Sequence, residues 1–290
     1  MKNHFEAIHL PDLPPFDTLA FAGGGNRCWW QGGLIAHLLE RGWALPHQLV
    51  GTSAGAALAA ACMSAGPRTA FQACRELYGR NDRLFNWHGL ARLKLQFAHQ
   101  HIYPTWLESF VSSEHFEAIK RSGRQLRVAV TQPARALGLS GSLLAGSLAY
   151  LLDKKLAHSI HPRLPKWLGL KQAFFNFDQC ADASEARTLL QAAAAAAPFL
   201  HSRRVEGQWA FDGGYTDNAP IPPQTAPEKS KTLVLLTRHY PALPAAFVWR
   251  GRSYWQPSRP VPVSTWDCRP ATQIKAAFEL GLTDARKLFG

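Results

Sequence analysis

The chain has 290 residues, of which 47% are hydrophobic and 18% are charged. This composition excludes a disordered or fibrous protein, and the length suffices for one large domain or two small ones with a substantial core. The 32 Lys and Arg against 20 Asp and Glu give a formal net charge of +12, which favours an anionic partner, either a nucleic acid or a membrane surface.

The chain alternates apolar runs, typical of buried strands, with segments of helical period. A strand is predicted at 17–22 and another at 49–50, and a helix follows each, the second one Ala-rich over 54–64. Residues 67–120 predict several amphipathic helical pieces. The remaining predictions are strands at 124–131, 173–177, 209–211 and 231–237, a helix over 184–197, a Pro- and aromatic-rich surface excursion over 241–262, and a final helix with Ile274, Phe278, Leu282, Ala285 and Phe289 on one face. Apolar strands that alternate with helices favour an α/β fold with a mostly parallel, covered sheet.

Neither a leader nor a membrane span is indicated. The start, MKNHFEAIHLPDLPPFD, lacks the apolar run of a Sec signal peptide, so we expect a cytoplasmic protein, with or without peripheral membrane contact. Residues 137–152 are uncharged but shorter than the roughly 20 apolar residues of a span, and they predict a buried or membrane-touching helix. The five widely spaced cysteines argue against a disulfide framework and a zinc knuckle.

The sharpest motif is Gly51-Thr52-Ser53-Ala54-Gly55, a G-x-S-x-G between a short strand and a helix. In this context the serine lies on a tight turn, and glycine on both sides avoids a collision with neighbouring backbone. The turn exposes the hydroxyl at the helix N-terminus, where the positive end of the dipole favours developing negative charge. Taken alone, the motif could also be a purely structural turn.

Two further glycine motifs support a serine site. Gly23-Gly24-Gly25-Asn26-Arg27 follows the first strand and leaves backbone N–H groups unobstructed, as an oxyanion hole requires. A phosphate-binding loop fits poorly, because Cys28 stands where G-x-G-x-x-G needs glycine. Phe211-Asp212-Gly213-Gly214 presents a carboxylate on a sharp turn, and a base beside a hydroxyl is what serine chemistry requires.

The three motifs together resemble those of the patatin-like phospholipases. The family pattern is G-G-G-x-R, then G-x-S-x-G, then D-G-G/A, which stand here at 23–27, 51–55 and 212–214. The continuation DGGYTDNAP and the Ala-rich segment AAAAAAPFL are also similar to the family, so the resemblance spans roughly residues 18–236. The sequence departs from the pattern at Ala22, before the glycine run, and at Cys28, after the arginine.

The resemblance implies a patatin-like three-layer α/β/α sandwich with a mostly parallel central sheet. It further implies one catalytic domain over 1–290, with a core at about 17–238 followed by the excursion and the final helix of 239–290. Ser53 would be the nucleophile and Asp212 its base, and no metal or other cofactor would be needed. The substrate would be a lipid, cleaved at its acyl esters. The backbone amides of Gly24, Gly25 and Asn26 would form the oxyanion hole, and the residues that complete the motifs are Gly23, Arg27, Gly51, Gly55, Gly213 and Gly214.

The main alternative enzyme is an α/β-hydrolase with a triad of Ser53, Asp212 and His239. Position 53 leaves room for only one strand and one helix before the nucleophile, whereas that fold needs several strands there. Close histidines can also indicate a metal site, but none here matches a metal-binding motif, so we assign no metal. These histidines are His99 with His101 and His158 with His161.

Non-enzymatic functions start from the basic excess. Arg80–Lys94 interleaves basic and aromatic residues, which is typical of nucleic-acid binding, of a basic amphipathic helix on a membrane, or of a plain solvated helix face. We expect no nucleic-acid partner and favour peripheral contact with an anionic membrane surface. The remaining alternative is a catalytically silent relative that binds lipid or nucleic acid.

Overall fold

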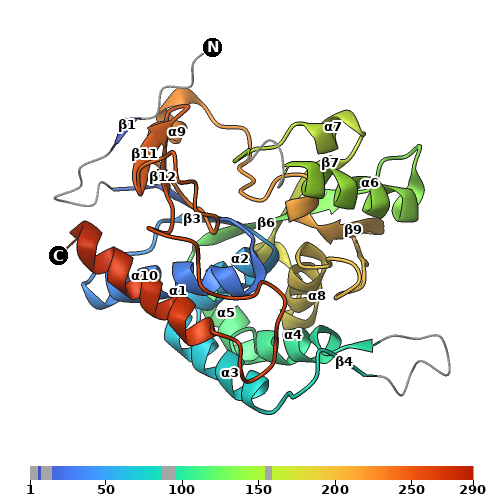
Figure 1. The fold of residues 1–290 in the computed structure, drawn as a ribbon, viewed down its shortest axis with the longest axis horizontal. Helices are drawn as coiled ribbons and strands as arrows, with labels where there is room; N and C mark the ends of the chain where they lie inside the picture. The colour runs from blue at the N-terminus through green and yellow to red at the C-terminus, as the bar shows by residue number, and fades with distance from the viewer. Residues whose placement is uncertain (1–5, 8–14, 87–95, 154–158, 290) are drawn as a thin grey trace.

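The computed structural model describes residues 6–7, 15–86, 96–153 and 159–289. These residues form a ten-stranded sheet in the order β1-β11-β12-β10-β2-β3-β6-β9-β8, with β7 paired to β6 (Figure 1). The strands are β1 (Glu6–Ala7), β2 (Thr18–Phe21), β3 (Gln48–Thr52), β6 (Gln125–Gln132), β7 (Lys171–Asn176), β8 (Arg203–Val205), β9 (Gln208–Asp212), β10 (Thr232–Leu235), β11 (Ala246–Trp249) and β12 (Arg252–Trp255), and a separate pair is formed by β4 (Phe85–Asn86) and β5 (Gln96–Phe97).

The five strands at the centre of the sheet, β12, β10, β2, β3 and β6, are parallel to one another. The strands outside them pair antiparallel. Every strand predicted from the sequence is present, with bounds that differ by a few residues. The prediction of an α/β fold with parallel central strands is therefore confirmed.

The central strands are apolar on both faces, which explains why their sequences read as continuous hydrophobic runs. Leu19 and Phe21 face the larger core, while Ala20 and Val234 face a smaller cluster on the opposite side. Seven helices pack around the larger core: α1 (Cys28–Glu40), α2 (Ser53–Met63), α3 (Pro67–Gly79), α4 (His99–Glu108), α5 (Ser113–Arg121), α8 (Ala183–Ala193) and α10 (Ile274–Phe289).

The opposite layer is thinner and consists largely of loops. Ile221, Tyr240 and Leu243 pack on the smaller cluster from connecting segments. The helices on this side are α6 (Gly138–Leu152), α7 (Leu164–Trp167) and α9 (Ala226–Ser230). None of the helices that the structure describes combines the length and the apolar character needed to cross a bilayer.

The expectation of a surface excursion over 241–262 is wrong. Strands β11 and β12 form a hairpin, and β12 extends the parallel part of the sheet by pairing with β10. Arg250 and Gly251, between the strands, have positive φ angles of 52° and 78°, as a two-residue hairpin turn requires. Phe247 and Trp255 are completely buried. The aromatic residues that suggested a surface segment are therefore core residues at this end of the sheet.

The predicted final helix, α10, is confirmed, and it crosses α1 with unusually close backbones. A Cβ atom added to Gly33 would lie 2.0 Å from the Phe278 carbonyl oxygen, and one added to Gly281 would lie 2.0 Å from the Trp30 carbonyl oxygen. The Trp30 indole N–H also donates a hydrogen bond of 2.8 Å to the buried carboxylate of Asp284. The C-terminal helix is thus part of the main core.

This crossing predicts that Gly281→Ala destabilises the protein. The added methyl group must push the two helices apart, and overpacking of this kind costs about 1–3 kcal/mol of unfolding free energy. Urea denaturation followed by circular dichroism measures the loss. Gly79→Ala is the control, because nothing lies within 4 Å of its added Cβ and the helical position favours alanine. Equal stability of the two variants would contradict the close crossing.

Candidate active site

Strand pairing brings the two predicted catalytic residues together along one edge of β6. Strand β3 pairs with residues 125–129 of β6, and β9 pairs with the next two residues. Strand β7 pairs with residues 127–132 along the other edge of β6. Strand β9 therefore pairs along the edge that β3 leaves free beyond residue 129. Ser53 directly follows β3, and Asp212 is the last residue of β9. The topology therefore joins two residues that are 159 positions apart in the sequence.

Ser53 occupies a sharp turn between β3 and α2. Its φ of 52° lies in the left-handed region, which is strained for a residue other than glycine. The flanking glycines allow close backbone approach: a Cβ on Gly51 would lie 2.5 Å from the Cα of Ala56, and one on Gly55 would lie 2.5 Å from the Ala22 carbonyl oxygen. The turn that the motif predicts is thus present.

The Ser53 hydroxyl donates a 2.7 Å hydrogen bond to Oδ2 of Asp212. The other carboxylate oxygen, Oδ1, accepts a 2.8 Å bond from the backbone N–H of Gly214. Both side chains belong to residues only 5% exposed to solvent. Burial raises the pKa of Asp212 from its usual 3.8 to about 6, although the bonds from Ser53 and Gly214 act in the opposite direction. The carboxylate is therefore a stronger base than an exposed aspartate.

The backbone of Asp212 is held from two sides. Its N–H donates to the Ala195 carbonyl at 3.2 Å, and its carbonyl accepts a 2.9 Å bond from the hydroxyl of Thr131. The sequence predicted that this helix continues to 197, whereas α8 ends at Ala193. The first bond explains the difference, because the chain leaves the helix and passes beside β9. Gly213 fits closely here too, since a Cβ on it would lie 2.2 Å from the Thr52 hydroxyl.

The glycine-rich loop lies next to the serine. The N–H of Gly23 donates to the Asn218 carbonyl, and the Gly23 carbonyl accepts from the side-chain amide of Asn218, both at 2.8 Å. The glycine-rich loop is thus hydrogen-bonded to the segment that follows Asp212-Gly213-Gly214. Among the described residues, the N–H groups of Gly24 and Gly25 have no hydrogen-bond partner. The N–H of Asn26 donates to the Thr265 carbonyl at 3.1 Å. Of the three predicted oxyanion donors, the N–H groups of Gly24 and Gly25 are therefore free to bind an oxyanion, and that of Asn26 is already hydrogen-bonded.

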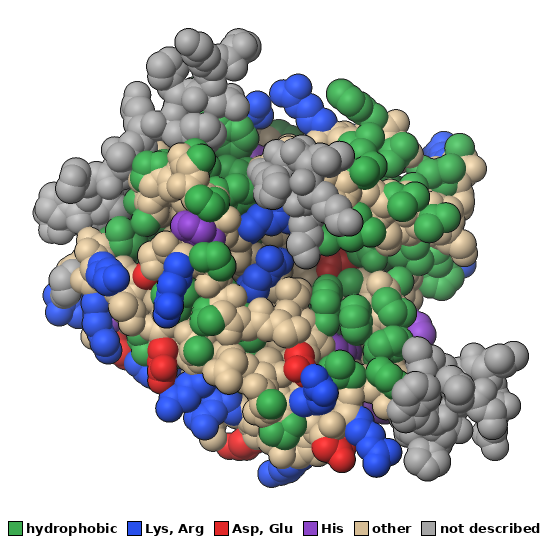
Figure 2. Space-filling model, in the orientation of Figure 1, with side chains coloured by type: hydrophobic (Ala, Val, Ile, Leu, Met, Phe, Trp, Pro, Cys, Tyr) green, Lys and Arg blue, Asp and Glu red, His purple; other side chains and the backbone are tan. Residues whose placement is uncertain are grey.

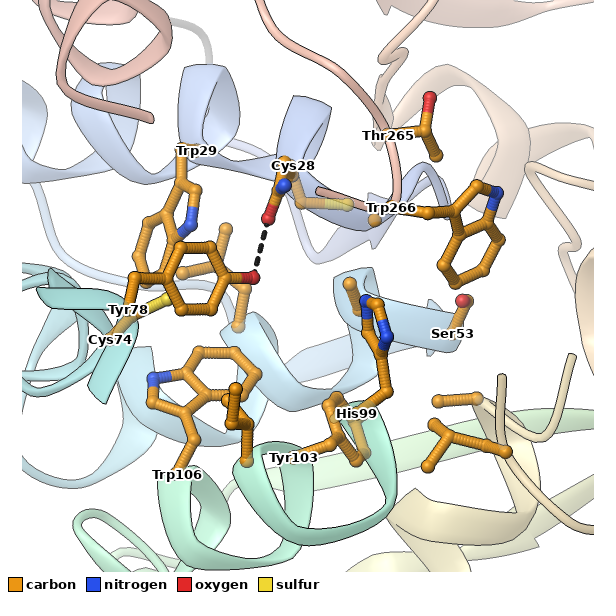
Figure 3. A pocket seen from close by; sticks show the side chains of 17 residues that line it. Cys28, Trp29, Ser53, Cys74, Tyr78, His99, Tyr103, Trp106, Thr265 and Trp266 are labelled. Carbon is orange, nitrogen blue, oxygen red and sulfur yellow. Dashed lines mark hydrogen bonds between the residues drawn. The ribbon is translucent and has the colours of Figure 1, made fainter. Parts of the chain in front are cut away.

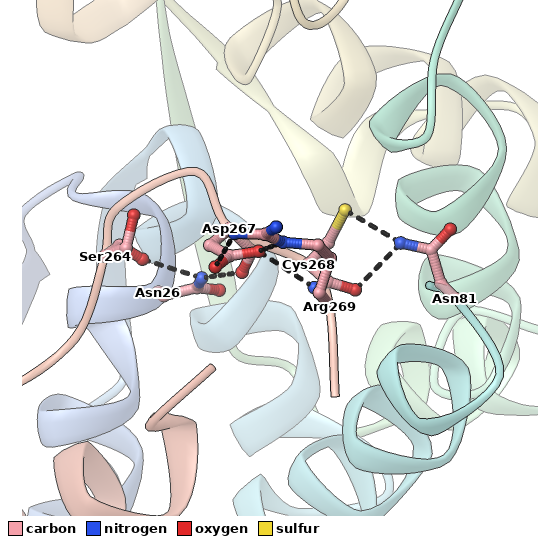
Figure 4. A network of polar contacts seen from close by, with 6 residues as sticks. All are labelled: Asn26, Asn81, Ser264, Asp267, Cys268 and Arg269. Atoms are coloured by element: carbon pink, nitrogen blue, oxygen red, sulfur yellow. Dashed lines mark hydrogen bonds and ion pairs between the residues drawn. The ribbon is translucent and has the colours of Figure 1, made fainter. Parts of the chain in front are cut away.

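A segment distant in sequence, 264–268, covers this loop (Figure 4). The Asn26 side-chain amide donates to the carbonyls of Ser264 and Asp267 at 2.9 and 2.6 Å. Asn81 donates to the Cys268 carbonyl at 2.9 Å, and the Trp266 ring stacks on Phe199 with centroids 4.7 Å apart. No motif in the sequence indicated that the 264–268 segment belongs to the site, because most of the hydrogen bonds that hold it end at its main-chain carbonyls.

An apolar cavity opens beside Ser53 toward the helical layer (Figure 3). Its volume is about 60 Å³, enough for a few water molecules or methylene groups. Trp29 and Trp106 line it, and His99 projects into it near Ser53. Burial lowers the pKa of His99 to about 4, and its Nδ1 atom has no hydrogen-bond partner. The imidazole is therefore neutral at pH 7, a feature that the sequence did not indicate.

A second cavity, of about 230 Å³, meets the first at Ser53. It is more polar, and Arg27 and Asn218 contribute to its wall. Helix α6 supplies three of its lining residues, Ser147, Tyr150 and Leu151. The apolar and the larger cavity share Ser53, Gly25, Thr265 and Trp266. The serine is thus accessible from two sides that differ in polarity.

His239 and His161 have hydrogen-bond partners other than Ser53 and Asp212. The ring of His239 is hydrogen-bonded to the Pro257 carbonyl at 2.8 Å, whereas both oxygens of Asp212 bond to Ser53 and Gly214. His161 lies within 2.8 Å of an Asp217 oxygen. The described residues contain no group of three or more His, Cys, Asp or Glu side chains suited to a metal ion. Residues 87–94 of the basic stretch Arg80–Lys94 lie outside the described residues, as does His158.

Comparison with known proteins was made by family model, by sequence and by structure. The family model for patatin-like phospholipases matches residues 19–223. No curated protein gave a significant match. The crystal structure of VipD from Legionella pneumophila is similar with a TM-score of 0.40 and 12% identity over 80% of this chain and 52% of that chain, so this chain spans about half of VipD. Because the family model covers most of the sequence, the chain belongs to the patatin-like phospholipase family, a family of lipid acyl hydrolases.

Proposed function

We propose that the protein is a serine acyl hydrolase of phospholipids, with Ser53 as the nucleophile and Asp212 as its base. The observation that carries the proposal is the 2.7 Å hydrogen bond between the serine hydroxyl and the buried carboxylate. Activation of a serine requires a base within hydrogen-bonding distance of its hydroxyl. The position of Ser53 at the N-terminus of α2 adds favourable electrostatics. The two cavities that meet at Ser53 leave room for an ester on either side of it.

In the acylation step, Asp212 accepts the hydroxyl proton while the Ser53 oxygen forms a bond to the ester carbonyl carbon. The carbonyl π electrons move onto the carbonyl oxygen, which becomes an oxyanion. When the tetrahedral intermediate collapses, the bond to the leaving alcohol breaks and Asp212 returns its proton to that alcohol. The product on the enzyme is an acyl ester of Ser53.

The oxyanion needs hydrogen-bond donors aimed at it, and each donor is worth about 100- to 1000-fold in rate. The unoccupied N–H groups of Gly24 and Gly25 suit this role. Participation of the Asn26 N–H stays a prediction that requires its bond to Thr265 to open. The positive end of α2, which begins at Ser53, adds to the stabilisation.

In the second step a water molecule takes the place of the alcohol. Asp212 accepts a proton from the water, the hydroxide oxygen bonds to the acyl carbon, and the bond to Ser53 breaks to release the fatty acid. The serine oxygen regains its proton from Asp212. The raised pKa of Asp212 supports this role, because a base works best when its pKa lies near the working pH.

The lining of the two cavities supports an orientation of the lipid. The apolar cavity, with its tryptophans and buried histidine, suits the first methylene groups of the acyl chain next to the ester. The larger cavity, with Arg27 and Asn218 in its wall, suits the glycerol and the phosphate of the leaving group. A net charge of +12 favours lipid substrates that lie in an anionic membrane.

The proposed pair of residues predicts the effect of two substitutions. Ser53→Ala and Asp212→Asn should each lower kcat/KM for a soluble ester by at least about 1000-fold, because the two residues act as one unit. Turnover of p-nitrophenyl butyrate measures the loss, and a fluorophosphonate probe should label the parent protein but not Ser53→Ala.

His239→Ala is the matched control for this experiment. Its ring bonds to a backbone carbonyl outside the site, so activity should stay within a fewfold of the parent. Loss of activity in this variant, with an unchanged fold, would support the triad and contradict the proposal. Full activity of Ser53→Ala would contradict both.

The environment of Asp212 predicts how activity depends on pH. Only the ionised carboxylate can accept the serine proton, so kcat/KM should rise with pH through a midpoint near 6 and then level off. The same pKa shift has the opposite effect on stability. The folded protein binds the proton of Asp212 more tightly than the unfolded chain does. The contribution of Asp212 to the free energy of unfolding is therefore lost as pH rises from 3.8 to about 6. A midpoint near 4 would contradict the raised pKa of Asp212, because that is the ordinary pKa of an aspartate.

The proposed orientation predicts which cavity controls chain length. Ile102→Trp fills the apolar cavity from α4 and should lower kcat/KM for a decanoyl ester at least about tenfold more than for an acetyl ester. Ser147→Trp narrows the larger cavity instead and should affect both simple esters alike. If Ser147→Trp were the variant that discriminates by chain length, the orientation would be reversed.

A further inference from the structure

One side of the molecule carries nearly all the large hydrophobic side chains that the described residues leave exposed. Trp167 is 78% exposed, and five leucines of α6 and its N-cap are 43–64% exposed. Apart from Trp209, every such side chain belongs to this region, which we call the α6–α7 face. It consists of Leu137, Leu144, Leu148, Leu151, Leu152, Trp167 and Leu168. Figure 2 shows hydrophobic side chains gathered over the place that α6 and α7 occupy in Figure 1.

The exposed leucines are not needed to hold α6 on the protein. The helix is anchored by its small residues, since Ser142, Gly146 and Ala149 are the buried ones. A Cβ on Gly146 would lie 2.6 Å from the Tyr215 ring, so the contact on that side is close. Leu144 and Leu148, one helical turn apart, point away from this contact. Apolar surface of this extent marks a site of interaction.

The charges around the face indicate what it contacts. Arg135, Arg163, Lys166 and Lys171 are all exposed within or beside it. Among residues 134–153 and 159–171 the single carboxylate is Asp153, which forms an ion pair of 3.5 Å with Arg238 and is largely buried. Exposed leucines and a tryptophan surrounded by cations are complementary to a bilayer with anionic headgroups.

The same helix connects the face to the candidate active site. Ser147, Tyr150 and Leu151 line the larger cavity together with Ser53 and Asp212. Leu151 therefore belongs to both the exposed face and the cavity wall. A lipid drawn from a bilayer in contact with this face could reach the cavity along α6 with little exposure of its acyl chains to water.

We propose that the α6–α7 face docks the protein on the surface of an anionic phospholipid bilayer. The leucines and Trp167 enter the upper acyl region, while the four cations lie at the level of the phosphates. The fate of the lipid after docking rests on the proposed function, but docking itself does not require a working catalytic residue. The two can therefore be tested separately.

The binding test uses Ser53→Ala protein, so that the vesicles are not consumed. Vesicles of phosphatidylcholine with roughly a third phosphatidylglycerol should bind it in a flotation assay, and pure phosphatidylcholine should bind it more weakly. Leu144→Gln/Leu148→Gln should weaken binding at least about tenfold for each leucine replaced. Neither residue lines a cavity at Ser53.

A charge variant gives an independent readout. Lys166→Glu/Lys171→Glu should weaken binding to the anionic vesicles at least about tenfold, and high salt should reduce the difference. The matched control is Lys275→Glu/Lys287→Glu on α10, which lies far from α6 (Figure 1) and has the same change in net charge. The control should bind within a fewfold of the parent. An equal loss in both variants would mean that net charge, not this face, governs binding.

An activity test distinguishes failure of the docking proposal from failure of the proposed function. With the catalytic serine intact, Leu144→Gln/Leu148→Gln should hydrolyse a soluble butyrate ester at the parent rate while losing at least about tenfold on vesicle phospholipid. Normal vesicle binding by this variant would overturn the docking face. Face-dependent binding without any Ser53-dependent hydrolysis would keep the docking face and overturn the proposed function.

The competing occupant of the face is a second copy of this chain. Sedimentation velocity in the absence of lipid decides this point: we expect a monomer for the parent and for both variants. A parent dimer that the leucine variant converts to a monomer, together with unchanged vesicle binding, would assign the face to self-association and overturn the proposal.

Discussion

The hydrogen bond from Ser53 to Asp212 exists because the C-terminal ends of β3 and β9 meet along the same edge of β6. Each partner is buried, and a buried hydroxyl left without a partner costs about 1–3 kcal/mol, a buried carboxylate more. The turn at Ser53 adds backbone strain, which persists only where surrounding packing determines the conformation. Helix α2, buried along most of its length in the main core, provides that packing. The site therefore depends on the sheet register and on the helical layer together.

The residues of the three motifs were predictable because each has a backbone requirement that few amino acids meet. Gly51 and Gly55 lie where no side chain fits, and the carboxylate of Asp212 ends a strand on a tight turn. Such requirements leave a local pattern in the sequence. The parallel central strands were predictable for a related reason, since burial on both faces produces continuous apolar runs.

Other parts of the site leave no local pattern. The contact between Asn26 and residues 264 and 267 joins positions more than 230 apart, and any residue can supply a main-chain carbonyl. The hairpin of β11 and β12 was missed because prolines and aromatics suggested a surface segment, although the paired turn at Arg250 and Gly251 was the signal to follow. His99 was considered as half of a metal pair, whereas its burial beside Ser53 is a tertiary property.

The hydrogen bonds that hold the 264–268 segment fix its backbone and leave most of its side chains free to vary. The bonds from Asn26 and the 2.9 Å bond from Asn81 reach main-chain carbonyls, so they remain when the side chains of the segment are replaced. By contrast, the 3.3 Å bond from Asn81 to the Cys268 Sγ depends on a side chain of the segment. Thr265 and Trp266 nevertheless form part of the wall of both cavities. The segment also lies outside residues 19–223. Evolution, or a laboratory library, can therefore change the cavity walls at these two positions while Ser53, Asp212 and the strands that carry them stay the same.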